Sequence, residues 1–198
     1  MNSNGVHYER AFEAYLRQRR LPYVAVNQAR RAVFDGVRLK SFDFLIYPPA
    51  QMRILADVKG RRLELSAYQR GRLGESWVTT EDVDGLKRWQ EVFGRSYRSI
   101  FVFAYWLHGE PLRSESSTTI SLGPLRAVID TPAQPELPDV FSFQGRLYAF
   151  KAVELNAYRL GMKLRSASWR TVYVPRRIFR HVVEPLDNFI RPRRKKAN

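Results

Sequence analysis

The sequence predicts an α/β fold with a mixed sheet, and two observations predict it. The hydrophobic patterns up to residue 109 follow one another as helix, strand, strand, strand, helix and strand, which is typical of a compact α/β unit. The last of these strands, Ile100 to Leu107, is apolar throughout, as expected for a strand buried on both faces of a sheet. Hydrophobic residues make up 44% of the 198 positions, which is enough for a packed core.

The chain opens with a predicted helix over residues 5–20. Apolar side chains recur on one face of that helix, and Leu21-Pro22 ends it. A short strand over residues 23–26 and a polar, basic connection through Arg38 are expected to follow.

Two strands over residues 41–47 and 53–60 flank a five-residue loop and predict an antiparallel hairpin, with Tyr47 opposite Arg53. Residues 61–78 carry no clear pattern, although part of them is compatible with a helix. Thr79 or Thr80 then caps a helix that runs to Phe93 and stops at Gly94, before the buried strand.

The part after residue 109 is predicted to be a basic region of strands and a helix. Its expected elements are short strands within 119–130 that break at Gly123-Pro124, a hairpin over 141–150, a strand over 171–174 and a helix from Pro175. The domain organisation is therefore a core over 1–109, an extension over 110–190 packed on that core, and a basic tail over 191–198.

The composition excludes several classes of site. The chain has no cysteine, which rules out disulfide scaffolds, thiolate nucleophiles and cysteine-ligated zinc, and only three histidines. No segment approaches the roughly 18 apolar residues of a membrane-spanning helix, and the start lacks the pattern of a signal peptide. We therefore expect a soluble bacterial cytoplasmic protein without a membrane partner, associated with the nucleoid if it binds DNA.

Positive charge is concentrated near the end of the chain. The formal net charge is +15, and residues 159–196 contribute 12 Lys or Arg against 2 acidic residues. This excess favours a polyanionic partner, DNA above all, although a solubilising tail has the same composition. The expected nucleic-acid-binding residues are Arg176, Arg177, Arg180, Arg193, Arg194, Lys195 and Lys196.

The predicted hairpin places two carboxylates opposite each other. With Tyr47 paired to Arg53, Asp43 faces Asp57, and Lys59 projects from the same face of its strand. Two adjacent carboxylates repel unless a cation lies between them or one is protonated, and Mg²⁺ prefers such oxygen ligands. The alternative is an exposed hairpin in which Asp57 and Lys59 form a weak surface ion pair.

Glu9 favours the first of these interpretations. It lies at the margin of the apolar stripe of the opening helix, where an isolated Glu is uncommon, and from there it reaches toward Asp43 and Asp57. An ion pair with a nearby Arg is the alternative explanation of its position.

Glu9 on a leading helix, Asp43 on a strand and Asp57-Val58-Lys59 on the next strand together resemble the signature of the PD-(D/E)XK nuclease superfamily. The resemblance covers residues 5–107 and implies a restriction-endonuclease-like αβββαβ core, in which Asp43 and Asp57 bind Mg²⁺ or Mn²⁺. It also implies that Lys59 assists the attacking water and that Glu9 contributes to the metal's coordination or its surroundings. Phe42 stands where many members have Pro.

Two further features belong to this resemblance. Some members of the superfamily add a polar residue from the helix after the D-x-K strand, and Gln90 is the candidate here, although its position favours a Gln hydrogen-bonded to backbone. The opening His7-Tyr8-Glu9-Arg10-Ala11-Phe12-Glu13 also resembles the motif that names the bacterial HYExAFE family, which implies no established reaction.

These features lead to three functional hypotheses. The first is an endonuclease-like protein that hydrolyses DNA phosphodiester bonds with a metal-activated water. Its catalytic set is Glu9, Asp43, Asp57, Lys59 and Gln90, and a homodimer is compatible with this activity. The second is a catalytically inactive nucleic-acid-binding protein that retains the nuclease fold. The third is a structural or partner-binding protein whose charge is incidental.

Overall fold

The structure is a computed structural model of the chain. It describes residues 3–26, 32–34, 37–49, 52–112, 118–122, 125–129 and 139–191. Within these ranges, only the backbone is described for 3–5, 32–34, 37–39, 118–122 and 125–129.

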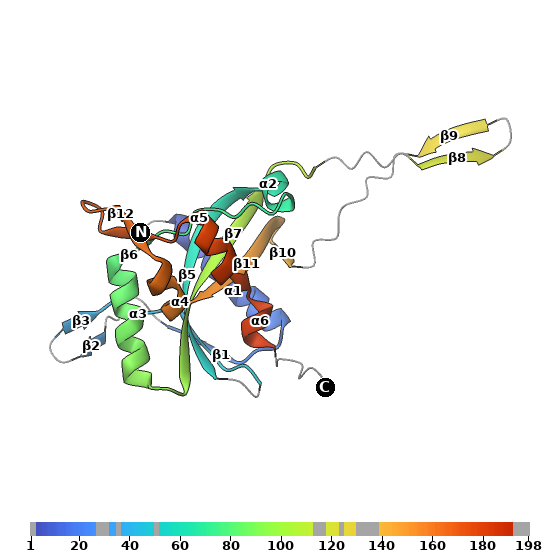
Figure 1. The fold of residues 1–198 in the computed structure, drawn as a ribbon. Helices are drawn as coiled ribbons and strands as arrows, with labels where there is room; N and C mark the ends of the chain where they lie inside the picture. Colours follow the sequence, from blue (N-terminus) through green and yellow to red (C-terminus); the bar gives the residue numbers. More distant parts are fainter. Residues whose placement is uncertain are drawn as a thin grey trace, which may run out of the picture.

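A mixed sheet forms the centre of the molecule (Figure 1). Its strands run in the order β1-β4-β5-β7-β11-β10, and β14 also pairs with β11. β5 and β7 are parallel, whereas every other neighbouring pair in this sheet is antiparallel. The predicted α/β class with a mixed sheet is therefore confirmed. The strands are β1 (Tyr23–Ala25), β4 (Phe44–Ile46), β5 (Arg53–Glu64), β7 (Tyr97–His108), β10 (Val140–Phe143), β11 (Arg146–Glu154) and β14 (Glu184–Pro185).

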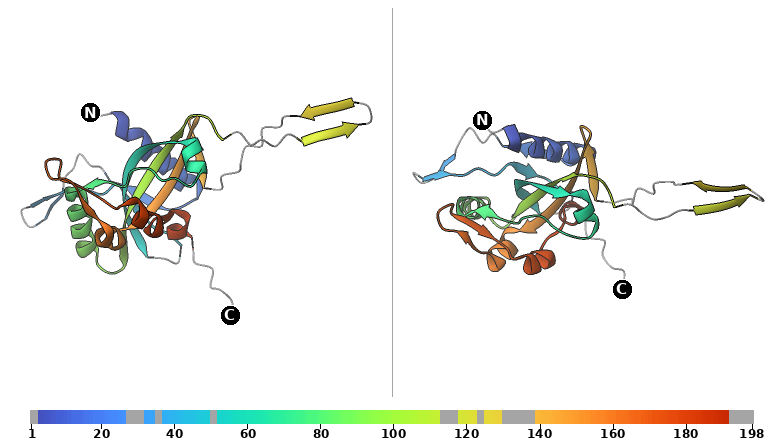
Figure 2. Two further views of the ribbon diagram at one scale, coloured as in Figure 1. Left: turned by 45° about the horizontal axis from the view of Figure 1, so that its top comes forward. Right: turned by 90° about the horizontal axis from the view of Figure 1, so that it is seen from above.

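Helices cover both faces of this sheet (Figure 2). On one face lies α1, and on the other lie α3, α4 and α5, as the two hydrophobic clusters of the core also show. The small helix α6 packs its buried residues into the same cluster as α1. The helices are α1 (Ser3–Gln18), α2 (Leu65–Gln69), α3 (Thr80–Phe93), α4 (Leu155–Gly161), α5 (Arg176–Val182) and α6 (Asp187–Ile190).

Smaller sheets accompany the central one. The first is three-stranded, with the order β12-β13-β6, and the others are the pairs β2-β3 and β8-β9. The pair β8-β9 corresponds to the two strands expected within 119–130. The bounds are β2 (Ala32–Phe34), β3 (Val37–Leu39), β6 (Val78–Thr79), β8 (Thr118–Leu122), β9 (Leu125–Ile129), β12 (Lys163–Ser166) and β13 (Thr171–Tyr173).

The apolar periodicity of α1 and the caps of α3 explain how the two helices near the site are placed. In α1, the apolar side chains at helical spacing are all buried: Tyr8, Ala11, Phe12, Tyr15 and Leu16. For α3, Thr79 is the N-cap, with a capping box to Asp82, and Gly94 ends the helix at a positive φ of 77°. Both helices therefore match their predictions.

Several elements differ from the predictions. β5 continues to Glu64 instead of ending at Gly60, because Arg61 to Glu64 pair with Tyr105 to His108 of β7. The connection before Arg38 contains β2 and β3, which the sequence did not predict. α4 was also missed, since a helix of seven residues with only Leu155 and Tyr158 buried gives too short a pattern.

The region after residue 109 adds strands to the central sheet. β11 pairs with β7 from Leu147 opposite Leu107 to Glu154 opposite Ile100. The division of the chain at residue 109 into a core and an extension stays a prediction. None of the helices in the described part of the chain combines the length and the apolar character needed to cross a membrane.

The alternation of side chains along β5 determines where the polar residues point. Ile54, Ala56 and Val58 belong to the hydrophobic cluster on the α1 side, whereas Leu55 belongs to the cluster on the other side. By the same alternation, Asp57 and Lys59 project toward the layer that contains α3.

Candidate functional site

The two predicted carboxylates lie side by side where β4 begins. β4 and β5 pair as Phe44 with Ala56, Leu45 with Leu55 and Ile46 with Ile54. The predicted hairpin register is therefore confirmed over these three pairs, and continuing it by one residue would set Asp43 against Asp57. Both side chains are buried, with 4% and 5% of the residue surface exposed, and the alternative of an exposed hairpin is therefore wrong.

Asp43 is held by the end of the β4–β5 ladder. Because β4 begins at Phe44, the backbone N–H of Val58 has no carbonyl partner in β4. It donates instead to Oδ2 of Asp43 at 2.5 Å. The backbone N–H of Asp43 in turn donates to the carbonyl of Ala56 in β5 at 2.9 Å. Its orientation is therefore fixed by both strands.

Burial raises the pKa of both carboxyls. For Asp43, the Val58 N–H and the charge of Lys59 oppose this effect, and the charge of Glu9 adds to it. For Asp57, Lys59 opposes the effect of burial, while the charges of Asp43 and Asp82 raise the pKa further. The pair is therefore a buried site with too much negative charge, which is the environment that a bound cation relieves.

Lys59 provides the compensating positive charge. Its Nζ donates to Oδ1 of Asp57 at 2.8 Å and to Oδ1 of Asp82 at 2.9 Å. Burial alone would lower the pKa of Lys59, but these two carboxylates raise it above its ordinary value. Lys59 is therefore a fixed cation and hydrogen-bond donor, and it does not accept protons near neutral pH.

Asp82 is the partner that the sequence analysis missed. It lies in the first turn of α3, where its side chain accepts the Thr79 N–H at 2.8 Å and also forms an ion pair with Lys40. Burial would raise the pKa of Asp82, but Lys59 and Lys40 hold it well below its usual range. The Thr-x-x-Asp spacing did signal the capping box, whereas the contact with Lys59 depends on the packing of α3 against β5.

Glu9 approaches the site from the opposite face of the sheet. It is half-buried on α1, and burial raises the pKa of its carboxyl, the charge of Asp57 raises it further and Lys59 lowers it. Glu9 is thus close enough to interact electrostatically with Asp57.

Gln90 lies outside this cluster. Its amide donates to the carbonyls of Gly94 and Tyr97, and its Oε1 accepts the Ser99 N–H at 2.8 Å. The side-chain amide thus ties the end of α3 to the start of β7. This arrangement favours the backbone-bonded interpretation of Gln90 over a catalytic one.

The predicted nucleic-acid-binding residues fall into two groups. Arg176, Arg177 and Arg180 lie on α5 and are exposed. The other four, Arg193, Arg194, Lys195 and Lys196, lie outside the described residues. Within 155–183 there is no Asp or Glu, and all seven Lys and Arg of that segment are exposed.

The donor set fits a hard cation only in part. No three His, Cys, Asp or Glu residues of the described chain lie close enough together to hold a metal ion. Asp43 and Asp57 alone are suitable, because Mg²⁺ is commonly held by one or two carboxylates and keeps several waters. The expectation that Glu9 contributes to the metal's coordination or its surroundings stays a prediction.

The comparison with solved structures gives four matching chains. The structure of Archaeoglobus fulgidus Hjc, described as a Holliday junction resolvase from an archaeal hyperthermophile, matches with a TM-score of 0.46 and 9% sequence identity. The match covers 90% of this chain and 94% of that chain. No family model matches the chain, and no curated protein does. The resemblance to the HYExAFE family therefore stays a prediction.

Proposed function

We propose that this chain is a metal-dependent endonuclease that hydrolyses phosphodiester bonds of DNA. The observation that carries the proposal is the buried pair Asp43 and Asp57, with the Lys59 ammonium 2.8 Å from Asp57. Burying two groups of like charge lowers the stability of the fold, and such arrangements concentrate at functional sites.

The residues divide the chemistry among them. Asp43 and Asp57 would hold Mg²⁺ or Mn²⁺, which when bound supplies an acidified water and positive charge toward the phosphate. Lys59 stays protonated and donates to a phosphate oxygen or to the attacking water, because both of its carboxylate partners keep its charge. Asp82 orients Lys59, and Glu9 contributes negative charge beside Asp57 without coordinating.

The partner is proposed to be DNA because of the charge distribution. The segment 155–183 presents seven exposed Lys and Arg and no acidic residue, and among the interactions described for it only Arg165 forms an ion pair. Contacts of this kind go to phosphates and give salt-dependent binding with little sequence preference. We place the protein in the bacterial cytoplasm, where a homodimer would allow both strands to be cut.

Plasmid cleavage by the wild type and by Asp57→Asn, in a titration with Mg²⁺ and with Mn²⁺, tests the proposal. Asn keeps the size of the side chain but removes the charge that a cation needs. We expect the wild type to nick the plasmid and the variant to lose at least a hundredfold of that rate, on the order of the effect of one electrostatic contribution in an active site. Equal cleavage by both proteins would indicate another site or a contaminating nuclease.

A catalytically inactive DNA-binding protein is the second candidate. It is favoured by the incomplete donor set, since only two carboxylates are suitably placed for a metal among the described residues. In that case neither protein cleaves with either metal, while both retard DNA on a gel with strong salt dependence. A third result, neither cleavage nor retardation, would leave the basic segment with a role in solubility alone.

A further inference from the structure

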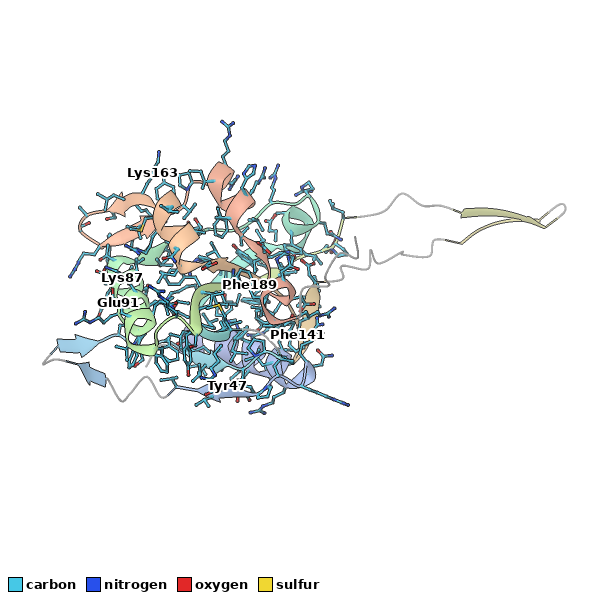
Figure 3. All side chains as sticks on the ribbon, turned by 60° about the horizontal axis from the view of Figure 1, so that its bottom comes forward. Tyr47, Lys87, Glu91, Phe141, Lys163 and Phe189 are labelled. Carbon is cyan, nitrogen blue, oxygen red and sulfur yellow. The ribbon has the colours of Figure 1, made fainter. Side chains whose placement is uncertain are left out.

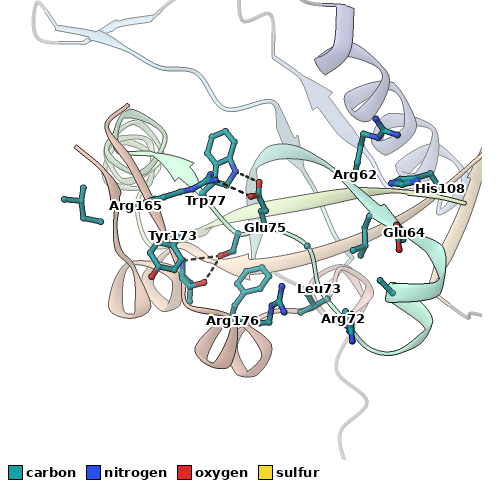
Figure 4. Close-up of a pocket in the computed structure, with 17 residues that line it drawn as sticks. Arg62, Glu64, Arg72, Leu73, Glu75, Trp77, His108, Arg165, Tyr173 and Arg176 are labelled. Atoms are coloured by element: carbon teal, nitrogen blue, oxygen red, sulfur yellow. Dashed lines mark hydrogen bonds and ion pairs between the residues drawn. The ribbon is translucent and has the colours of Figure 1, made fainter. Parts of the chain in front are cut away.

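A cleft of about 800 Å³ lies apart from the carboxylate site (Figure 4). Three parts of the chain surround it: the end of β5 with the segment after α2, the strands β12 and β13, and the start of α5. Its volume is in the range of sites that hold small organic ligands, about 300–1,000 Å³.

The lining of this cleft is positively charged. Its charged residues are Arg62, Arg72, Arg165, Arg176, Glu64 and Glu75. Glu75 is engaged by Arg165 at 3.2 Å and by the Trp77 indole N–H at 2.7 Å. In the described structure no ion pair involves Arg72 or Arg176, so these guanidinium groups are available to an anion, whereas Arg62 lies over the Trp106 ring at 5.0 Å on the α1 side of β5.

A further positive charge, that of Arg61, lies next to Trp77, which lines the cleft. The guanidinium carbon of Arg61 lies 4.3 Å from the centre of the Trp77 ring, its two terminal nitrogens donate to the carbonyls of Gly60 and Trp77, and its Nε is buried without a hydrogen-bond partner. No carboxylate of the described chain forms an ion pair with Arg61. A buried and unpaired cation increases the positive potential at the adjacent surface, because little solvent screens it.

The cleft also offers planar groups. Arg165 lies over the Trp77 ring at 5.0 Å, and its side chain keeps 42% of its surface exposed. Tyr173 of β13 lines the same cleft. Guanidinium planes and aromatic rings are the surfaces on which unpaired bases stack, whereas a duplex keeps its bases stacked on one another.

Strand β5 runs from the carboxylate site to the cleft. Lys59, Arg61 and Leu63 alternate onto the same face of β5, and Leu63 lines the cleft. Four residues of a strand span about 13 Å, so the cleft begins about that far from Lys59. A DNA strand whose phosphate lies at Asp43 and Asp57 therefore reaches the cleft within a few nucleotides.

We propose that this cleft binds an unpaired segment of the DNA substrate, so that the chain prefers DNA with a single-stranded or branched part. Arg72 and Arg176 would contact phosphates, and a base would stack on Arg165 or Tyr173. The proposal rests on the proposed function, because it takes the strand at the carboxylate site as its starting point.

The test measures binding separately from cleavage, in the full chain carrying Asp57→Asn. Fluorescence anisotropy gives the affinity for a labelled single-stranded oligonucleotide and for a duplex of the same length, each over a range of salt concentrations. The test variants are Arg72→Ala and Arg165→Ala. The control is Lys87→Ala, because Lys87 is exposed on α3, pairs with Glu91 at 3.7 Å and does not line the cleft (Figure 3).

We expect both cleft variants to bind the single strand more weakly, with a larger loss than for the duplex. For Arg72→Ala, removal of one phosphate contact lowers the salt slope on the single strand by about 0.7. The control variant should match the parent on both ligands. Urea midpoints equal to that of the parent show that the cleft variants are folded.

Three results would overturn the inference. Equal losses on single strand and duplex would make the cleft part of a general duplex surface. Affinities of the cleft variants equal to that of Lys87→Ala would exclude the cleft altogether. If inorganic phosphate displaces the labelled oligonucleotide at concentrations similar to those at which an added nucleotide displaces it, the cleft is an anion site only. Absence of plasmid cleavage by the wild type contradicts the proposed function alone, since the binding comparison does not depend on hydrolysis.

Discussion

Replacing Asp82 tests whether the buried charge network is a real source of stability. Asp82 is 4% exposed, and it is bound at once by Lys59, Lys40 and the Thr79 backbone N–H. Asp82→Asn keeps an oxygen that accepts from Thr79 but removes the negative charge. Asp82→Ala removes both. The difference between the two variants therefore separates the ion pairs from the helix cap.

The magnitude follows from the surroundings of Lys59. Removing one partner of a buried ion pair costs about 3–5 kcal/mol when the other charge is left alone. Lys59 keeps Asp57 as a partner, so we expect Asp82→Asn to lower the free energy of unfolding by about 2–3 kcal/mol. Asp82→Ala should cost about 1 kcal/mol more, the typical effect of losing a cap.

Urea unfolding followed by tryptophan fluorescence measures these differences, with Glu91→Gln as the matched control. Glu91 lies on the same helix and pairs with Lys87 at 3.7 Å, but about half of its surface is exposed (Figure 3). Exposed helix pairs contribute about 0.3–0.5 kcal/mol, so the control should change little. An Asp82→Asn effect no larger than that of the control would refute the reasoning.

The pH dependence provides a second check on Asp82. Because the pKa of Asp82 is lower in the folded chain than in the unfolded chain, its carboxylate stabilises the fold at pH values above the unfolded pKa of about 3.9. That stability is lost as the pH falls from there toward the lower, folded pKa. The difference between wild type and Asp82→Asn should therefore be smaller at pH 3 than at pH 5. A difference that does not change with pH would contradict an electrostatic origin.

Three further variants test other parts of the structure. In EDTA, Asp43→Asn should raise the free energy of unfolding by about 0.5–2 kcal/mol, because it relieves the repulsion from Asp57. The same variant should lose cleavage. A lower stability in urea titrations would contradict this prediction. Gly60→Ala should cost about 1–3 kcal/mol, since its Cβ would lie 2.2 Å from Cδ2 of Tyr8, and a double-mutant cycle should show a smaller cost in a Tyr8→Ala background. Gln90→Ala should lower stability by about 1–3 kcal/mol by leaving the buried Ser99 N–H unpaired, whereas unchanged stability with lost cleavage would restore a catalytic role for Gln90.

Local patterns in the sequence were sufficient for much of the fold. The apolar stripe of α1, the capping box and terminal glycine of α3, and the buried strand β7 each follow from spacing within a few residues. The register of β4 and β5 followed from the length of the loop between them. Elements with short or polar patterns, such as α4 and the extension of β5, were missed because their partners lie far away in the sequence.

In the candidate site, too, some features follow from the sequence and others follow only from the tertiary structure. The sequence alone determined that Asp43 and Asp57 face each other and that Lys59 shares their face, because a strand alternates its side chains regardless of what packs on it. Only the tertiary structure decided that α3 brings Asp82 to Lys59, that α1 leaves Glu9 on the other face, and that Gln90 bonds to backbone. These outcomes depend on which face of the sheet each helix covers, and helix placement is set by the packing of the whole core.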